Sequence, residues 1–369
     1  MPFLSLTLFN FRNLRNNTID LLSREVYFVG ENGQGKSNLL EALYYSAYGT
    51  SFRTHSDSDI VRYGEKDFSV KAFFQNDKGN AHSILVVSKN GKKTIEKNGK
   101  KIHDRKELIN TMPCVLFNHD DLVFAEGEPE NRRFFLDQSL SMYDVLYIDI
   151  MRRYKKILKS RNQCLRDEKY EMLDVFDKQL ITDGIEMQKR RKKTVFEFNQ
   201  IFGQLYEEVS GIDGVSISYE PSWKEIRDDT ASRIPTCEEV ADSMMKKRES
   251  DKILKTTLTG PHRDKINFIR NNDSFIPSAS TGQRRLISLI LRVAQAVLFT
   301  RITGEKPVLL MDDVLLELDP DKRQKFTAIL PEYNQLFCTF LPGEPYERYK
   351  HTDTKIFFIQ EGTWNEQRL

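Results

Sequence analysis

The chain has 369 residues, 39% of them hydrophobic and 30% charged, so it is long enough for two globular domains. Its formal net charge of +2 excludes a strongly basic or acidic protein, and any basic surface must come from local clustering. The four cysteines, Cys114, Cys164, Cys237 and Cys338, lie far apart with no Cys/His cluster, which excludes a thiolate metal site and predicts reduced thiols in the cytoplasm.

The N-terminal part is expected to be rich in strands. Residues 3–9 alternate apolar and polar side chains, as a half-buried strand does, and they lack the basic segment of a signal peptide. No apolar run approaches the roughly twenty residues that span a bilayer, so we expect no membrane partner. The Asn-Gly pairs at 90–91 and 98–99 predict hairpin turns. Further strands are predicted at 25–29, 68–75, 82–88 and 93–97.

A phosphate-binding loop follows the strand at 25–29. The sequence Gly-Glu-Asn-Gly-Gln-Gly-Lys-Ser matches G-x-x-x-x-G-K-S, and a helical apolar pattern follows it. Glycines allow backbone N–H groups to surround a phosphate chain, and the next helix adds its positive dipole end. We expect Lys36 to reach the β- and γ-phosphates of ATP and the Ser37 hydroxyl to bind Mg²⁺. The predicted nucleotide-binding residues here are Gly30, Glu31, Asn32, Gly33, Gln34, Gly35, Lys36, Ser37 and Asn38.

Long helices are predicted in the middle of the chain. No proline occurs between Glu130 and Glu220, and residues 151–193 hold 14 Lys and Arg against 7 Asp and Glu. These basic side chains are either a contact surface for the phosphate backbone of DNA or the solvated face of helices. Arg53, just after the loop and its helix, could contact nucleotide or DNA or be a solvated loop residue. The elements expected here are helices at 143–167, 171–209 and 236–250 and a strand at 214–219.

An acidic strand end supplies the second part of an ATP site. The apolar strand at 307–311 ends in Asp312 and Asp313, and Mg²⁺ on nucleotide phosphates needs an acidic second ligand. We expect Asp312 to be this ligand and Asp313 to position or deprotonate the attacking water, with Lys36 as a third catalytic residue. Adjacent strand residues face opposite ways, so the chain must turn at this point. The other elements expected in this part are strands at 266–270, 274–276, 335–340 and 354–360 and helices at 281–299 and 320–330.

A second phosphate site is predicted at the start of the helix at 281–299. Ser280, Gly282 and Gln283 combine a hydroxyl, a flexible glycine and free helical N–H groups, although Ser278, Ser280 or Thr281 could equally cap the helix. One γ-phosphate cannot readily be held by both helix ends of one subunit. These residues therefore predict a homodimer in which each ATP lies between two opposed subunits.

Together these motifs resemble the RecF family of bacterial recombination-mediator ATPases. The resemblance implies an α/β fold: a P-loop ABC-type ATPase head of mixed sheet and helices, similar to the heads of SMC proteins, with an inserted, mainly helical second lobe. The head would comprise residues 1–137 and 258–369, and the lobe residues 138–257. The segments that carry the resemblance, in chain order, are 10–13, 30–42, 51–53, 132–137, 260–264, 280–283 and 310–319.

The resemblance also implies a function. Such a protein dimerises with ATP on single- and double-stranded DNA near gaps, hydrolyses ATP slowly as a DNA-dependent ATPase, and works with RecO and RecR to place RecA during repair, replication and the SOS response. Arg12 and Asn13 are similar to an N-terminal pair that approaches the nucleotide, residues 118–122 correspond to a lid loop, and Ser280, Gly282 and Gln283 act across the dimer. The sequence departs from the family pattern at His119, Thr281, Lys265 and Leu316.

Two other classes of protein remain as alternatives. In a structural scaffold of a repair complex, nucleotide would only set the shape and hydrolysis would be incidental; Leu316, which replaces a hydrogen-bonding residue of the family, favours this alternative. A small-molecule kinase leaves the segment from Ser280 to Gln283 unexplained, and a transporter ATPase lacks a transmembrane partner segment in this chain.

Overall fold

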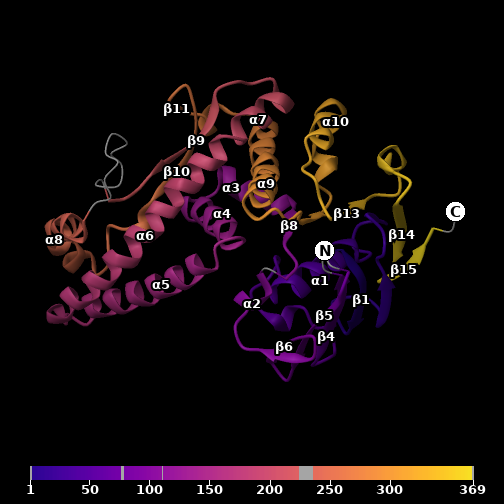
Figure 1. Cartoon of the computed structure of the whole chain (residues 1–369), viewed down its shortest axis with the longest axis horizontal. Coiled ribbons are helices and arrows are strands. Elements are labelled where there is room, and N and C mark those ends of the chain that lie inside the picture. Colours follow the sequence, from indigo (N-terminus) through magenta and orange to yellow (C-terminus); the bar gives the residue numbers. More distant parts are fainter. Residues whose placement is uncertain (1, 76–78, 110, 224–235, 368–369) are drawn as a thin grey trace. The chain divides into compact units, whose positions relative to one another are not determined.

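The computed structural model describes residues 2–75, 79–109, 111–223 and 236–367, apart from the side chains of Leu316 and Glu317. The sequence at 77–80, Asp-Lys-Gly-Asn, predicts a turn between the strands at 68–75 and 82–88, and this turn lies partly outside the described residues. The chain forms two compact units: the first unit consists of Met1–Asp120 and Gln295–Leu369, and the second unit of Asp121–Ala294 (Figure 1). This division groups residues 121–137 and 258–294 with the helical segment, whereas the sequence-based division placed them in the head.

A mostly parallel sheet forms one layer of the first unit. Its strand order is β15-β14-β3-β13-β12-β8, with β15 antiparallel to β14 and the other neighbours parallel. All five residues of β3 are buried, as the continuous apolar run predicts for a central parallel strand. The strands are β3 (Glu25–Val29), β8 (Cys114–Phe117), β12 (Val308–Met311), β13 (Gln335–Phe340), β14 (Thr354–Gln360) and β15 (Thr363–Glu366).

The first unit also contains an antiparallel sheet with the order β2-β1-β4-β5-β6-β7. Strand β4 alternates strictly between buried and half-buried residues, so one face of this sheet packs inward. The strands are β1 (Phe3–Phe9), β2 (Asn17–Asp20), β4 (Phe68–Gln75), β5 (Ala81–Lys89), β6 (Lys92–Lys97) and β7 (Lys100–Ile102).

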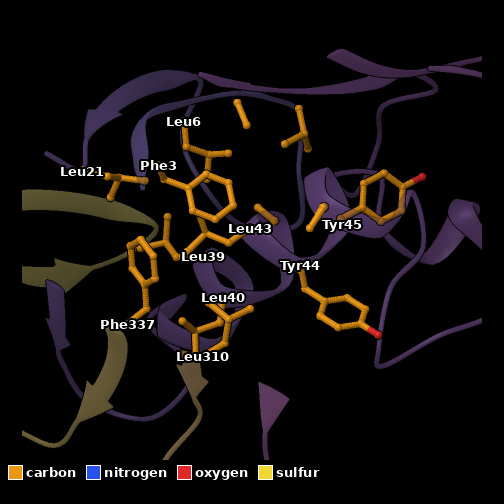
Figure 2. Packing of buried hydrophobic residues seen from close by; sticks show 14 of the residues in the cluster. Phe3, Leu6, Leu21, Leu39, Leu40, Leu43, Tyr44, Tyr45, Leu310 and Phe337 are labelled. Carbon is orange, nitrogen blue, oxygen red and sulfur yellow. The ribbon is translucent and has the colours of Figure 1, made fainter. Parts of the chain in front are cut away.

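Helix α1 (Lys36–Tyr48) contacts strands of both sheets and is buried along most of its length. Figure 2 shows Leu39 and Leu43 of α1 close to Phe3 of the antiparallel sheet, and Leu40 close to Leu310 of the parallel sheet. The helix that follows the glycine loop is therefore fixed by the core of the first unit. The short helices α2 (Lys106–Ile109) and α10 (Pro320–Ala328) complete this unit.

The second unit is mainly helical, as expected, with a small antiparallel sheet of order β11-β10-β9. Thr236 and Glu239 form a capping box at the start of α8. Helix α9 (Thr281–Thr303) contains residues of both units. The other elements are α3 (Val123–Glu126), α4 (Pro129–Ser141), α5 (Val145–Arg166), α6 (Leu173–Asn199), α7 (Phe202–Ser210), α8 (Cys237–Leu254), β9 (Val215–Glu220), β10 (Lys265–Arg270) and β11 (Asp273–Ser274).

The segment from Gly260 to Asp264 ends in a buried carboxylate that links several elements of the second unit. The Asp264 carboxylate is fully buried and accepts hydrogen bonds from Arg191 Nη1 at 2.8 Å and from the Tyr219 hydroxyl at 2.6 Å. Arg191 also forms an ion pair with Asp137 of α4 at 2.9 Å. Removing one member would leave an uncompensated charge in the interior, so this motif is a structural link between α4, α6 and the small sheet.

Two expectations about the bounds of elements were wrong. The helix expected at 171–209 is two helices, because the Asn199 side chain exchanges two 2.8 Å hydrogen bonds with the backbone of Ile217 and α6 ends there. The strand expected at 274–276 ends at Ser274, and a 3₁₀ turn follows it. From the sequence we expected no apolar run long enough to span a bilayer, whereas helix α9 is long and apolar enough by length and composition alone. Most of α9 is buried, as the core helices of proteins are. Strands β2, β7 and β15 were not expected.

Candidate functional site: a glycine loop facing an acidic strand end

The glycine loop connects β3 to α1, as predicted. Gly33 and Gly35 have φ angles of 78° and 117°, in the region that favours glycine, and Gly35 stands at the N-cap of α1. Gly30 is needed for another reason, because a Cβ atom there would lie 2.5 Å from the carbonyl oxygen of Ile359. The loop therefore turns tightly and presents the N-terminal N–H groups of α1, which is the geometry that binds phosphate.

Lys36 and Ser37 are held inside the first unit. Lys36 is buried, and its Nζ donates hydrogen bonds to the carbonyl oxygens of Gly30 at 2.8 Å and Glu31 at 3.3 Å. Ser37 Oγ donates to Asp312 Oδ1 at 2.8 Å. The structure thus brings the hydroxyl and the carboxylate predicted to bind Mg²⁺ into direct contact.

The surroundings of Asp312 fit a magnesium site. Burial raises the pKa of Asp312, while the Ser37 hydroxyl stabilises the charged form and the nearby Asp313 opposes it. A bound cation would offset this burial penalty. Within the part of the chain that the structure describes, no group of three or more His, Cys, Asp or Glu side chains gathers as a metal cage. Mg²⁺ needs no such cage, because it is usually held by one or two carboxylates together with phosphate oxygens.

The chain turns after β12, which allows both aspartates to face the same site. Asp313 has a φ of 54°, a left-handed conformation. The Thr339 hydroxyl lies 2.7 Å from Asp313 Oδ1 and 3.3 Å from Asp312 Oδ1, and it accepts a hydrogen bond of 2.8 Å from the Asp313 backbone N–H. Thr339 was missed in the sequence, although it is a polar residue within the otherwise apolar end of β13.

A pocket of about 440 Å³ lies beside the glycine loop. Asn13 Nδ2 donates to the Gly33 carbonyl oxygen at 3.1 Å, and Asn13 Oδ1 accepts a hydrogen bond of 2.7 Å from Asn38 Nδ2. Arg53 Nη1 in turn donates to Asn38 Oδ1 at 2.7 Å. The pocket is lined by Arg12, Asn13, Asn38, Arg53, Arg62 and Tyr63, of which Arg62 and Tyr63 were not predicted.

Arg12 is fixed by α1 itself. Its guanidinium donates to both oxygens of Glu41, at 2.9 and 2.7 Å, and the Glu41 side chain is fully buried. Such a two-point contact orients the planar guanidinium firmly.

Gln34 connects the glycine loop to the turn after β14. Its Oε1 accepts a hydrogen bond from the Glu361 backbone N–H, and its carbonyl oxygen accepts one from the Gly362 backbone N–H. Glu31 and Asn32 are exposed.

The predicted trans residues belong to the second unit. Ser280 Oγ accepts a hydrogen bond of 3.3 Å from the Gln283 backbone N–H, and Gln283 Oε1 accepts one of 2.7 Å from the Ser280 backbone N–H. This reciprocal pair is a capping box at the start of α9, so Ser280 is the cap among the three candidates. A Cβ atom added at Gly282 would meet no atom within 4 Å.

Ion pairs neutralise much of the basic stretch at 151–193. Arg153 pairs with Asp183 at 2.7 Å, Arg190 contacts Asp144, and Arg191 is buried between two aspartates. Lys189 and Lys193 pair within α6 with Glu186 and Glu197. The exposed basic residues of this stretch without an ion pair among the described residues include Lys155, Lys156, Lys159 and Lys178.

Comparisons with known proteins agree with this geometry. Residues 3–364 match the RecF/RecN/SMC N terminal domain. The chain is 48% identical over 363 residues to the DNA replication and repair protein RecF of Treponema pallidum, covering 98% of this chain and 100% of that protein. It also aligns with a solved structure of the recombination mediator protein RecF with ATP, from the RecFOR pathway, with a TM-score of 0.87 and 27% identity over 100% and 98% of the two chains.

An Smc head bound to the C-winged helix domain of ScpA shares the fold, with a TM-score of 0.60 and 15% identity over 100% of this chain and 98% of that one. The expected α/β ATPase-head fold is thereby confirmed. The glycine loop, the acidic strand end and the whole-length similarity to RecF proteins lead to one conclusion: this chain belongs to the RecF family of DNA replication and repair proteins.

Proposed function

We propose that this protein is an ATP-driven switch that dimerises on DNA, and that it acts in the cytoplasm during recombinational repair and replication. The observation that carries the proposal is the 2.8 Å contact between Ser37, at the end of the glycine loop, and Asp312, at the end of β12. This contact joins the phosphate-binding half of an ATP site to its acidic half within one compact unit.

Each residue of the site has a chemical role in this proposal. Lys36, released from the loop carbonyls, pairs with the β- and γ-phosphates. Ser37 and Asp312 would hold Mg²⁺, which would supply positive charge against the phosphates when bound. Asp313, kept in place by Thr339, orients the attacking water and accepts its proton. Arg12, Asn13 and Asn38 line the pocket that receives the rest of the nucleotide, and they form its nucleoside side.

Dimerisation supplies the switch. Ser280, Gly282 and Gln283 of one subunit contact the γ-phosphate held by the other, so ATP favours the dimer by binding it more tightly than the monomer. Hydrolysis is slow, stimulated by single- or double-stranded DNA, and releases the dimer. RecO and RecR are the proposed partners in placing RecA at gaps, including during the SOS response, by analogy with the relative described in the RecFOR pathway.

A scaffold without a phosphate contact in trans is the second candidate. The capping box favours it, because the Ser280 hydroxyl and the Gln283 side chain already have partners within their own helix end. In that case nucleotide binding would set the shape of one subunit, and the state of association would not depend on it.

Sedimentation of the protein with no nucleotide, ADP, ATP or a non-hydrolysable ATP analogue, with and without duplex DNA, tests the two candidates. We expect dimers only with the triphosphates. Ser280→Asp is the decisive variant, because aspartate still caps a helix but places a negative charge against the γ-phosphate. If Ser280→Asp dimerises like the wild type, or if the mass is the same in every nucleotide state, the scaffold is the better description. Ser280→Thr, which keeps the hydroxyl, is the matched control.

A further inference from the structure

A concentration of positive charge lies in the first unit, outside the ATP site. Residues 89–106 contain eight Lys and Arg but only two Asp and Glu, in a chain whose formal net charge is +2. They run from Lys89, the last residue of β5, through β6 and β7 to the start of α2, and β7 is the last strand in the sheet order. Most of the excess charge therefore lies at one edge of one sheet.

The strand register places two pairs of lysines opposite each other, and it places Lys101 opposite Glu96. Lys89 pairs with Lys92 across the first Asn-Gly turn, and Lys97 pairs with Lys100 across the second. Directly opposed like charges destabilise an antiparallel pair. Left-handed backbone at Asn90 and Gly91, and again at Asn98 and Gly99, fixes both turns, so the lysines cannot move apart by a change of register. The two lysine pairs are unfavourable for folding, and an anion bound beside them would offset this cost.

Two of the lysines on this edge are used by the fold. Lys93 donates to the Gly49 carbonyl oxygen at 2.9 Å and pairs with Asp57 at 2.8 Å, and Lys97 donates to Thr111 Oγ1 at 2.8 Å. The remaining ones point outward. Within the described ranges, the exposed lysines that have no carboxylate oxygen within 4 Å are Lys89, Lys92, Lys100 and Lys101. We call these four residues the lysine edge.

We propose that the lysine edge binds the phosphate backbone of duplex DNA. Strand β6, which joins its two ends, spans residues Lys92–Lys97, which is about 17 Å at 3.3 Å per residue. Duplex DNA carries one phosphate charge per about 1.7 Å of axis with both strands counted, so a duplex segment of this length carries roughly ten phosphates, and those on the near side suffice for four lysines. Lysine acts on phosphate as a point charge and reads no base sequence, as a protein that binds gaps of any sequence requires.

This inference rests on the proposed function, because it names residues through which the ATP-driven switch holds its DNA. The basic stretch at 151–193 spends several of its charges on ion pairs but also has four exposed lysines without one, so the experiment compares the two surfaces directly.

The experiment compares two quadruple variants of equal charge. One changes Lys89, Lys92, Lys100 and Lys101 to Gln. The matched control changes four exposed helical lysines without ion pairs to Gln: Lys155, Lys156, Lys159 and Lys178. Binding to a fluorescent duplex is measured with the ATP analogue at several salt concentrations. Each lost phosphate contact lowers the slope of log K against log salt by about 0.9, so the lysine-edge variant should lose about 3.6 and the helical control less than 1.

The outcomes separate this inference from the proposed function. If the slope of the lysine-edge variant is unchanged, or if the helical control loses as much or more, the inference is overturned and DNA binding itself stands. If the wild type binds no duplex, both fail. Nucleotide-dependent sedimentation of each variant, expected at the wild-type value, checks that a changed slope does not come from misfolding.

Discussion

Replacing Thr339 with valine isolates the contact that holds the acidic pair. Thr339 is 1% exposed, and its hydroxyl accepts the Asp313 N–H at 2.8 Å while lying 2.7 Å from Asp313 Oδ1. Valine has nearly the same shape, so the change removes the hydroxyl without opening a cavity. One hydrogen bond to a charged group is lost and one backbone donor loses its partner, which together destabilise the first unit by about 2 to 4 kcal/mol.

The measurement uses Trp364 of β15, which packs against the core of the first unit. The chain has two tryptophans, and in a Trp223→Phe background the fluorescence of Trp364 reports urea unfolding of that unit. Thr339→Ser is the control: it keeps the hydroxyl and loses a methyl group, at about 1 kcal/mol. We also expect Thr339→Val to slow ATP hydrolysis at least tenfold while nucleotide affinity changes less. The reasoning is refuted if the valine variant is as stable as the serine variant and hydrolyses ATP at the wild-type rate.

Three further predictions concern both units. Asp264→Asn leaves the buried Arg191 with one acidic partner and should lower the unfolding free energy by about 3 to 5 kcal/mol, measured by urea titration followed through Trp223. Burial lowers the pKa of His262 to about 4, so on acidification the unfolded chain takes up a proton on this histidine before the folded chain does. The contribution of His262 to the unfolding free energy is complete above pH 6.5 and is lost as the pH falls toward 4. Between pH 7.5 and 5 this loss is about 2 kcal/mol and should be absent in His262→Gln. Gly30→Ala should abolish ATP binding, because the new Cβ atom would collide with the carbonyl oxygen of Ile359. In Gly33→Ala the new Cβ atom would have no atom within 4 Å, so this variant should lose only about 1 kcal/mol of stability through backbone strain.

Each of these has a clear contrary result. An Asp264→Asn protein with wild-type stability would mean that the buried charge is compensated elsewhere. Equal pH dependence of the wild type and His262→Gln would assign the acid sensitivity to other groups. Equal ATP affinities of the Gly30→Ala and Gly33→Ala variants, determined by calorimetry, would contradict the close approach to Ile359.

The parts of the site that depend on neighbouring residues in the chain were predictable. A strand, a glycine loop and a helix are encoded within about twenty residues, and an apolar strand that ends in two aspartates is encoded in about seven. Sequence spacing could not predict that the glycine loop and the acidic strand end meet, because Ser37 and Asp312 are 275 positions apart. That prediction rested on the chemistry of Mg²⁺, which needs ligands from both segments. The mechanistic roles of these residues stay predictions.

Features created by pairs of distant segments were missed. Thr339 matters only because β13 pairs with β12, and sequence periodicity contains no strand order. The break between α6 and α7 depends on an amide at Asn199 that meets a strand eighteen residues later. The capping box at Ser280 was visible as a serine three residues before a glutamine, yet the same residues also fit a phosphate site, and sequence alone does not rank two uses of one hydroxyl. The lysines of β5–β7 were visible too, but their like-charge pairing requires the register.

The central place of β3 has a consequence for how the protein is made. The strand that leads into the glycine loop ends at Val29, but its two neighbours begin at Gln335 and Thr354. A ribosome adding about 5 to 20 residues per second needs roughly 15 to 60 s to supply them. Throughout that time Val26, Tyr27, Phe28 and Val29 have no sheet to join, and such a segment pairs readily with other nascent chains. Production of this protein in cells should therefore depend on holding chaperones, and C-terminal truncation even by the last two strands should leave the N-terminal half insoluble.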